Sequence, residues 1–445
     1  MLNEDDNNLV ARVGKGTPMG ELMRRYWLPA CVSSELAADG DPLRLVLLGE
    51  KLLAFRDSDG RIGVIDHLCP HRCASLFYGR NEEGGLRCVY HGWKFDVAGN
   101  CLDMPNVPAP QQNFKERVNV PSYKVAERNG VVWVYMGDGE APPLPEIPYN
   151  LLPPERLRIT QMQRECNWLQ ALEGDIDASH VDFLHGGTRT VADYPPDDPR
   201  RFGAMDRAPE YEVTETDWGT LYGAKRKADP GQSYWRLGQF VFPFWTVTPS
   251  SPFGSGAGIR AWVPMDDTHV MLFTFRRREN TAPQIGADRV GFRDKGSEFL
   301  PNTTDWYGRF RMPINRENDH LLDRTLQRDM NYTGVLGITE QDHAITESMG
   351  PIAERTKEHL VLSDHMIAVT RRRLIEAARK LRDEGHAPPA SEDSSLYAKV
   401  EGGYCVAPAT DSIWDVYNAQ FAAFQAAGGL NRSIVSAPLK LEVPS

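Results

Sequence analysis

The sequence lacks any apolar run close to the roughly 20 residues that a helix needs to cross a bilayer. Its first ten residues, MLNEDDNNLV, are acidic where a secretory signal would be basic. Basic side chains are also in the minority, with 50 Lys and Arg against 61 Asp and Glu and a net charge of -11. This balance argues against nucleic acid or an anionic membrane as a partner. We therefore expect a cytoplasmic protein that binds neither.

Cysteine is scarce as well. Seven cysteines in 445 residues are too few and too scattered for a disulfide scaffold, so each should be a free thiol or a metal ligand. Four of them have no other candidate ligand at metal-ligand spacing and are expected to be small buried residues: Cys31, Cys101, Cys166 and Cys405. The remaining three lie close together in one segment.

The length of the chain exceeds what one ordinary core supports, so at least two domains are expected. From residue 43 onward, short apolar runs alternate with Gly and Asp at turn-like intervals, which is typical of an all-β domain. Six prolines within residues 139–155 then indicate a boundary. The expected parts are an N-terminal helical segment at 1–40 that packs on the larger domain, an all-β domain at 41–145 and a second domain at 146–445.

The second domain alternates between strand and helix patterns. Strand-like runs such as GTLYGAKRK and THVMLFTFRR are separated by turn residues and predict an antiparallel sheet. Residues 353–385 keep apolar positions at steps of three and four and end at Gly385, as in a capped amphipathic helix. The expected fold class is therefore α+β, an all-β domain followed by an antiparallel sheet flanked by helices.

A first group of candidate metal ligands lies in the all-β domain. Cys69 and His71 form a C-x-H pair, and after 16 intervening residues Cys88 and His91 form a C-x-x-H pair. Two metal centres take two cysteines and two histidines, namely structural zinc and a Rieske [2Fe–2S] cluster. Each pair contributes one residue of each kind, which suits two irons held between two loops better than a common zinc finger.

In these loops, HLCPHRC and CVYHGW, the sequence resembles the Rieske family, and specifically the Rieske domain of non-haem iron ring-hydroxylating oxygenases. Rieske proteins of respiratory complexes carry one extra cysteine in each loop. Here the first loop contains Cys73 but the second has no counterpart, which favours the oxygenase type. Cys73 and His67 are expected to be packing or surface residues.

A second group of candidate ligands follows about ninety residues later. Mononuclear iron(II) oxygenases use two histidines and one carboxylate, and the pattern D-x-x-H-x-x-x-x-H at residues 177–185 resembles the iron motif of the same family. The resemblance makes His180 and His185 ligands. It also favours Asp342 as the third, since its surroundings resemble phthalate dioxygenase-like members. The nearby rivals are Glu340, His343 and Glu347.

Asp177 has a different implied role. In the family the matching acid accepts hydrogen bonds from a cluster histidine and an iron histidine, so it bridges two metals across a subunit boundary. The resemblance therefore implies a homo-oligomer, either a head-to-tail trimer or stacked trimers. Asp182 is expected to be an ordinary surface acid.

The resemblance covers nearly the whole chain and is closest to the phthalate and phenoxybenzoate dioxygenase group. It implies a terminal oxygenase (alpha) subunit with a Rieske cluster and a mononuclear Fe(II) that uses O2 to hydroxylate a small aromatic substrate, with cis-dihydroxylation expected. Electrons from NAD(P)H would arrive through a separate flavin and iron–sulfur reductase, because the sequence shows neither a dinucleotide motif nor a plant-type ferredoxin run. The alternatives are a monooxygenase or O-demethylase acting on a methoxylated or halogenated arene, a Rieske electron carrier and a zinc-stabilised binding protein.

Many members of that group act on aromatic carboxylates, so a phthalate isomer or a phenoxybenzoate is the expected substrate. A buried carboxylate calls for a basic side chain with bidentate reach. The candidates are Lys225, Arg226 and Arg236. Phe240, Phe244 and Trp245 are candidate lining residues, although core packing also explains them.

Overall fold

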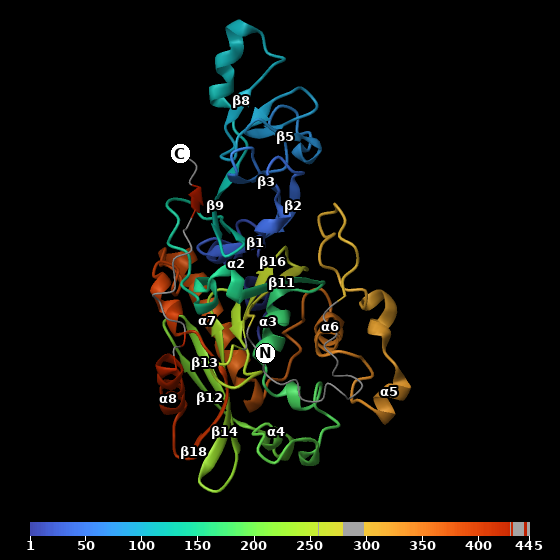
Figure 1. Cartoon of the computed structure of the whole chain (residues 1–445), viewed down its shortest axis with the longest axis vertical. Helices are drawn as coiled ribbons and strands as arrows, with labels where there is room; N and C mark the ends of the chain where they lie inside the picture. Colours follow the sequence, from blue (N-terminus) through green and yellow to red (C-terminus); the bar gives the residue numbers. More distant parts are fainter. Residues whose placement is uncertain (257, 279–297, 428, 430–439, 443–445) are drawn as a thin grey trace.

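The structure is a computed structural model that describes residues 1–256, 258–278, 298–427, 429 and 440–442. The molecule is elongated (Figure 1), with the strands of the first domain in the upper half and the larger domain below. In the described part of the chain, none of the helices combines the length and the apolar character that a membrane span requires.

The all-β part contains two sheets. The larger runs in the order β1-β10-β9-β4-β3-β2, and β19 pairs with β9 beside this path. Its strands are β1 (Trp27–Val32), β2 (Leu43–Leu47), β3 (Glu50–Arg56), β4 (Ile62–Asp66), β9 (Ser122–Arg128), β10 (Val131–Tyr135) and β19 (Lys440–Glu442). The smaller sheet comprises β5 (Arg80–Glu82), β6 (Gly85–Arg87), β7 (Lys94–Phe95) and β8 (Cys101–Asp103). It lies at the upper end of Figure 1.

The N-terminal segment differs from its expectation in one respect. It begins with two short helices, α1 (Glu4–Ala11) and α2 (Pro18–Met23), capped by the side chains of Asn3 and Thr17. It then continues into strand β1, which pairs with β10. The segment 1–40 is thus not helical throughout, because its apolar end completes the edge of the first sheet. At the other end of the chain, β19 also returns to this sheet, although the second domain was expected to run to residue 445.

The second domain is built on an antiparallel sheet, as expected. Its order is β11-β17-β16-β15-β14-β13-β12, and β18 pairs with β14. The strands are β11 (Leu157–Arg164), β12 (Glu210–Glu215), β13 (Gly219–Lys227), β14 (Gln232–Val241), β15 (Trp245–Val247), β16 (Ile259–Pro264), β17 (Val270–Arg277) and β18 (Gly403–Pro408).

Helices cover both faces of this sheet. On one face, Leu221, Trp235 and Leu237 pack against α8 (Ile413–Ala426). The alternate residues of the same strands point to the other face, which packs on α3 (Trp168–Ile176) and α7 (His365–Glu384). Helix α7 begins later than the pattern at 353–385 suggested and ends at Gly385, whose left-handed φ of 71° forms the expected cap. The remaining helices are α4 (Arg201–Met205), α5 (Arg324–Asp329) and α6 (Ile338–Ser348).

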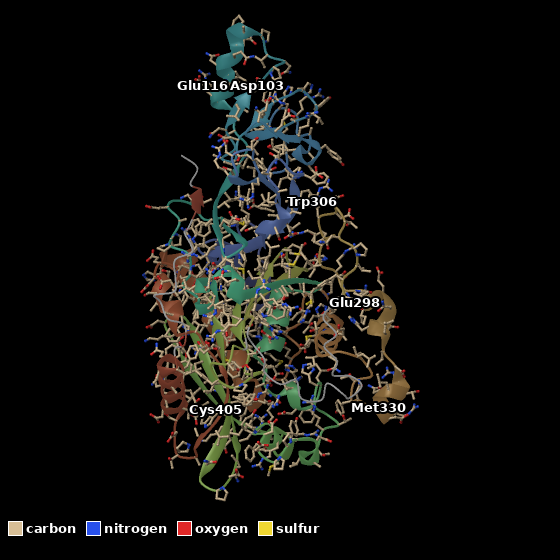
Figure 2. The ribbon with its side chains drawn as sticks, viewed as in Figure 1. Asp103, Glu116, Glu298, Trp306, Met330 and Cys405 are labelled. Atoms are coloured by element: carbon tan, nitrogen blue, oxygen red, sulfur yellow. The ribbon has the colours of Figure 1, made fainter. Side chains whose placement is uncertain are left out.

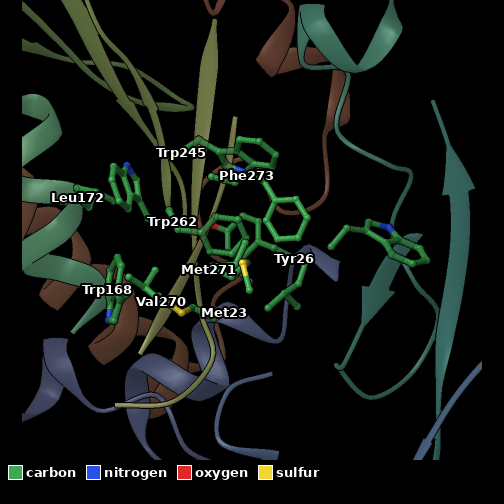
Figure 3. Packing of buried hydrophobic residues seen from close by; sticks show 14 of the residues in the cluster. Met23, Tyr26, Trp168, Leu172, Trp245, Trp262, Val270, Met271 and Phe273 are labelled. Carbon is green, nitrogen blue, oxygen red and sulfur yellow. The ribbon is translucent and has the colours of Figure 1, made fainter. Parts of the chain in front are cut away.

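One buried cluster joins the two domains. Trp133 of β10 stacks on Trp245 of β15 with ring centroids 6.0 Å apart. Figure 3 shows Trp168 and Trp262 in the same cluster. A second contact comes from Trp306, which lies at the junction of the two domains (Figure 2) with its ring centroid 5.0 Å from that of His67. The domains therefore share apolar packing, which stabilises their relative position.

Candidate metal centres and substrate site

The first group of ligands is presented by two loops with the same backbone hydrogen bonds. The N–H of Cys69 donates to the carbonyl of Ala74 at 2.8 Å, and the N–H of Cys88 donates to the carbonyl of Trp93 at 2.8 Å. A further N–H, four residues after each cysteine, donates back to the carbonyl of that cysteine. Each loop is thus closed by its own backbone, and the two cysteines occupy equivalent positions.

The fourth residue after each cysteine has left-handed backbone geometry. It is Cys73 in the first loop, with φ of 56°, and Gly92 in the second, with φ of 81°. A methyl group on Gly92 would lie 2.6 Å from Cγ of Pro105, so only glycine fits there. Cys73 is exposed. We find the other thiols largely as expected, since Cys31, Cys101 and Cys166 are buried and Cys405 is partly buried.

The donor atoms of the two loops suit a cluster. Cys69 and Cys88 are buried, and the rings of His71 and His91 lie 4.3 Å apart between centroids. Burial raises the pKa of the Cys69 thiol to about 12, and the neighbouring Cys88 thiol adds to this, so a cationic metal is needed to hold Cys69 as a thiolate. Nδ1 of His71 is buried without a partner in the described structure. The site therefore contains one buried metal-donor atom that no group of the described structure satisfies.

The spread of these donors distinguishes two metals. Tetrahedral zinc brings its four ligand atoms within roughly 3 to 4 Å of one another. Among the described residues, one group of three or more candidate ligands has all its ligand atoms within 4.8 Å of one another, and it includes none of these four residues. The four residues therefore do not converge on one ion. Separate binding of two irons by one cysteine pair and one histidine pair fits this geometry.

The converging set consists of His180, His185 and Asp342. His180 opens a short 3-10 turn (His180–Asp182) after α3, and Asp342 lies on α6. Nε2 of His180 and Nε2 of His185 are 3.2 Å apart. Oδ1 of Asp342 is 3.1 Å from Nε2 of His185 and 3.7 Å from Nε2 of His180. Two imidazoles and one carboxylate that meet in this way form a facial set for a divalent metal such as Fe(II).

The charges of this set support one another. Burial alone would raise the pKa of Asp342, but His185 and His180 hold it well below its ordinary value. Burial would lower the pKa of His180, but Asp177 and Asp342 raise it. Two imidazole rings and a carboxylate, one of them buried and two partly buried, thus form a site that can bind a cation.

Asp177 lies beside this set and not within it. Its Oδ1 accepts hydrogen bonds from the backbone N–H groups of Ser179 at 2.7 Å and His180 at 3.3 Å. Its Oδ2 is 3.7 Å from Nδ1 of His180, the ring nitrogen turned away from Asp342. Asp177 therefore shapes the turn that carries His180 and also faces its second nitrogen.

The rivals of Asp342 point elsewhere. Nε2 of His343 lies 3.1 Å from Sδ of Met162. Glu347 accepts the backbone N–H of Glu165 at 3.1 Å. Neither these two nor Glu340 belongs to the converging set found in the described residues.

The three basic candidates for substrate binding separate in the structure. Lys225 lies on the α8 face, with Nζ 4.9 Å from the ring centroid of Trp235 and 3.8 Å from Glu212, so it does not reach the histidines. Arg226 is buried and forms an ion pair with Asp182. Asp182 is therefore not the surface acid that was expected; its pairing with a sheet residue anchors the turn that carries His180.

Arg236 remains without an ion pair among the described residues, and its Nε is buried without a partner. It points to the same face of the sheet as Arg226, which pairs with Asp182 of the turn that carries His180. The hydroxyls of Tyr211 and Tyr222 are also buried without partners, and burial raises the pKa of both, which the charge of Arg236 offsets in part. Phe240 and Phe244 lie in the core instead. Of the three basic candidates, Arg236 is therefore the one that has no ion pair among the described residues and lies on the sheet face opposite α8.

One contact could not be foreseen from composition or spacing. Oε1 of Gln341 lies 2.8 Å from Nδ1 of His185, on the side of the ring opposite Asp342. Its only signal in the sequence is its place directly before Asp342.

Both halves of the chain match known protein families. Residues 26–124 match the family described as the Rieske [2Fe-2S] domain, and residues 134–435 match the family described as LigXa C-terminal domain like. The 3-chlorobenzoate-3,4-dioxygenase oxygenase subunit of Comamonas testosteroni is 46% identical over 92% of this chain and 95% of its own length. The phthalate 4,5-dioxygenase oxygenase subunit of Pseudomonas putida is 38% identical, over 85% and 86% of the two chains.

A solved structure has the same fold. Dicamba monooxygenase bound to dicamba superposes with a TM-score of 0.53 at 20% identity and covers 81% of this chain and 98% of its own.

Proposed function

The chain belongs to the Rieske non-haem iron oxygenases, as an oxygenase subunit of the phthalate dioxygenase-like group, and from this we propose that it hydroxylates a small aromatic carboxylate. The observation that carries this proposal is the convergence of His180, His185 and Asp342, together with Arg236, which forms no ion pair in the described structure and shares a sheet face with the Arg226 that pairs with Asp182. The ligand atoms of the three converging residues are suited to iron, and the guanidinium of Arg236 is suited to a carboxylate.

Two sets of residues would hold the metals. We assign Cys69, His71, Cys88 and His91 to the [2Fe–2S] cluster, and the converging set to Fe(II). When bound, the cluster supplies single electrons and the mononuclear iron activates O2. The role of the chain would be to orient these ligands and to hold the substrate beside the converging set.

Electrons must come from outside the subunit. Oxygenase subunits of this family work with separate electron-donating proteins, as in the complex of the carbazole 1,9a-dioxygenase oxygenase with its ferredoxin. For this chain we propose a flavin and iron–sulfur reductase that passes electrons from NAD(P)H to the cluster.

We further propose a head-to-tail trimer, alone or stacked. In one chain the small sheet beside the cysteine loops and the helices α3 and α6 lie in different parts of the elongated molecule (Figure 1). Exposed apolar side chains occur beside both sets of ligands: Val89 and Tyr90 are 60% and 54% exposed, and Phe183 and Ile345 are 42% and 44% exposed. A subunit contact that covers both would bring a cluster next to the Asp177 of its neighbour.

The substrate carboxylate is assigned to Arg236. Nε of Arg236 is buried without a partner in the described structure, and a charged group left without an anion carries a desolvation cost that a bound carboxylate removes. The unpartnered hydroxyls of Tyr211 and Tyr222 offer further donors on the same face. The two curated relatives act on chlorobenzoate and phthalate, according to their names, which agrees with this class.

The Arg236 assignment makes a first prediction. In Arg236→Met the KM for an aromatic carboxylate should rise about 10- to 100-fold, since a charge-assisted hydrogen bond contributes about 1.5–3 kcal/mol. Steady-state oxygen uptake over a range of substrate concentrations measures it. Lys225→Met is the matched control, because Lys225 lies on the opposite face of the sheet. An unchanged KM in Arg236→Met would refute the assignment.

The function itself is tested with purified protein and a surrogate reductase. The brown protein should contain about two cluster irons and one further iron per chain without stoichiometric zinc. Oxygen uptake coupled to NADH oxidation should appear with one of the phthalates or benzoates and yield a cis-dihydrodiol. A phenol or released formaldehyde as the product would instead show a monooxygenase or O-demethylase. A reducible cluster without oxygen uptake on any arene would show an electron carrier.

A further inference from the structure

Consecutive residues of α6 contact the two ring nitrogens of His185. Nε2 lies 3.1 Å from Oδ1 of Asp342, and Nδ1 lies 2.8 Å from Oε1 of Gln341. Gln341 is 2% exposed, so water does not compete for this contact. The ring is thus held from both sides by one helix.

The orientation of the Gln341 amide follows from its other partner. Its NH2 group lies 2.9 Å from the carbonyl oxygen of Val335. A carbonyl accepts and never donates, so the nitrogen of the amide must face Val335 and the oxygen must face His185. The chemistry of a backbone group therefore fixes the orientation of the amide.

The partner carbonyl is itself held in place. It accepts hydrogen bonds from Nδ2 of Asn331 and from the hydroxyl of Thr333, both at 3.2 Å. The side chain of Asn331 in turn accepts the backbone N–H of Gly334, which closes the turn at residues 331–335. A buried, hydrogen-bonded turn thus fixes the amide that touches His185.

The consequence concerns the tautomer of His185. An amide oxygen can only accept, so Nδ1 must carry a ring proton, which leaves Nε2 as the ring nitrogen that can bind a metal. The second histidine differs, because Nδ1 of His180 faces the carboxylate of Asp177 at 3.7 Å and has no hydrogen bond in the described structure. The ring of His185 is therefore held by Gln341. The ring of His180 faces Asp177 without a hydrogen bond at Nδ1 among the described residues.

We propose that Gln341 is a positioning residue that holds His185 as the Nδ1–H tautomer and thereby strengthens Fe(II) binding at Nε2. The proposal rests on the proposed function in that it takes His185 as an iron ligand. Loss of a hydrogen-bonding partner of a metal ligand typically weakens metal binding about 10- to 100-fold. We expect the same range here.

The test measures metal binding and not turnover. The mononuclear site of the full-length holoenzyme is emptied with a chelator under anaerobic conditions, which should leave the cluster, and Fe(II) is then titrated by calorimetry. Gln341→Met keeps the side-chain length and removes the acceptor, so its Kd should rise about 10- to 100-fold. Gln341→Glu keeps an acceptor for Nδ1 and can carry a proton for Val335, so it should recover most of the loss.

Gln163→Met is the matched control, because Gln163 is also buried but lies on β11 outside the converging set. Its Kd should equal that of the parent. Wild-type affinity in Gln341→Met would overturn the proposal, and so would a Gln341→Glu variant as weak as Gln341→Met, since packing would then explain the effect. If the parent protein takes up no Fe(II) after chelation, the proposed function fails instead, so the two failures are distinguishable.

Discussion

Replacing His185 with alanine is expected to abolish turnover while the protein remains brown. His185 is 8% exposed and supplies one of only three ligand atoms in the converging set. Loss of a partner of a metal ligand already costs about 10- to 100-fold, so loss of the ligand itself should cost more than that. The cysteine loops belong to the other domain and close through their own backbone hydrogen bonds. They should therefore keep the cluster.

Iron analysis and oxygen uptake measure this outcome together. The variant should lose about one iron per chain and retain about two with the absorption of the cluster. His343→Ala is the matched control, because His343 is a buried histidine next to Asp342 whose ring contacts Met162 instead. It should keep its iron. If His343→Ala lost the mononuclear iron and His185→Ala did not, the assigned ligand set would be wrong.

Asp177→Asn should keep both metals and yet slow turnover by about 10- to 100-fold, the cost usual for a group that orients a metal ligand. The amide oxygen of asparagine can still accept the backbone N–H groups of Ser179 and His180, so the turn that carries His180 survives. The negative charge that faces Nδ1 of His180 is lost. Asp177→Asn therefore tests the charge of Asp177 separately from its structural role.

The measurement is the reoxidation of the reduced cluster in a single turnover with substrate and O2. In Asp177→Asn the cluster should accept electrons at the parental rate and release them slowly. Asp177→Ala removes the turn acceptor as well and serves as the comparison variant. Parental reoxidation in Asp177→Asn, with slow reoxidation only in Asp177→Ala, would reduce Asp177 to a residue that supports the turn and would end its proposed role between subunits.

Part of this protein can be derived from the sequence because the signals are local. Each cysteine loop closes within six residues through its own backbone, so its spacing survives any tertiary arrangement. The antiparallel sheet of the second domain follows from alternation along single strands, and the cap of α7 follows from Gly385. These features depend on neighbours in the chain, and pattern alone expresses them.

Other features depend on contacts between distant segments. Strand β1 lies in a segment that the sequence predicts to be helical. It forms a strand because it pairs with β10, which lies about one hundred residues later. From the sequence alone Asp182 is expected to be a surface acid, but it forms an ion pair with Arg226 of the sheet. From the sequence, Lys225, Arg226 and Arg236 are equivalent candidates for binding the substrate carboxylate. Strand alternation and the position of α8 place Lys225 on one face of the sheet and Arg236 on the other.

By itself, then, the sequence determined the two ligand motifs and the chemistry that they serve, since each motif is a short run of residues with its own geometry. The tertiary structure decided what completes them. Helix α6 packs beside the end of α3 and brings Asp342 to the two histidines, while Gln341 reaches the far side of a ring 156 residues earlier in the chain. Such contacts arise from the packing of helices on a shared sheet, and no local pattern of residues encodes which side chains that packing will join.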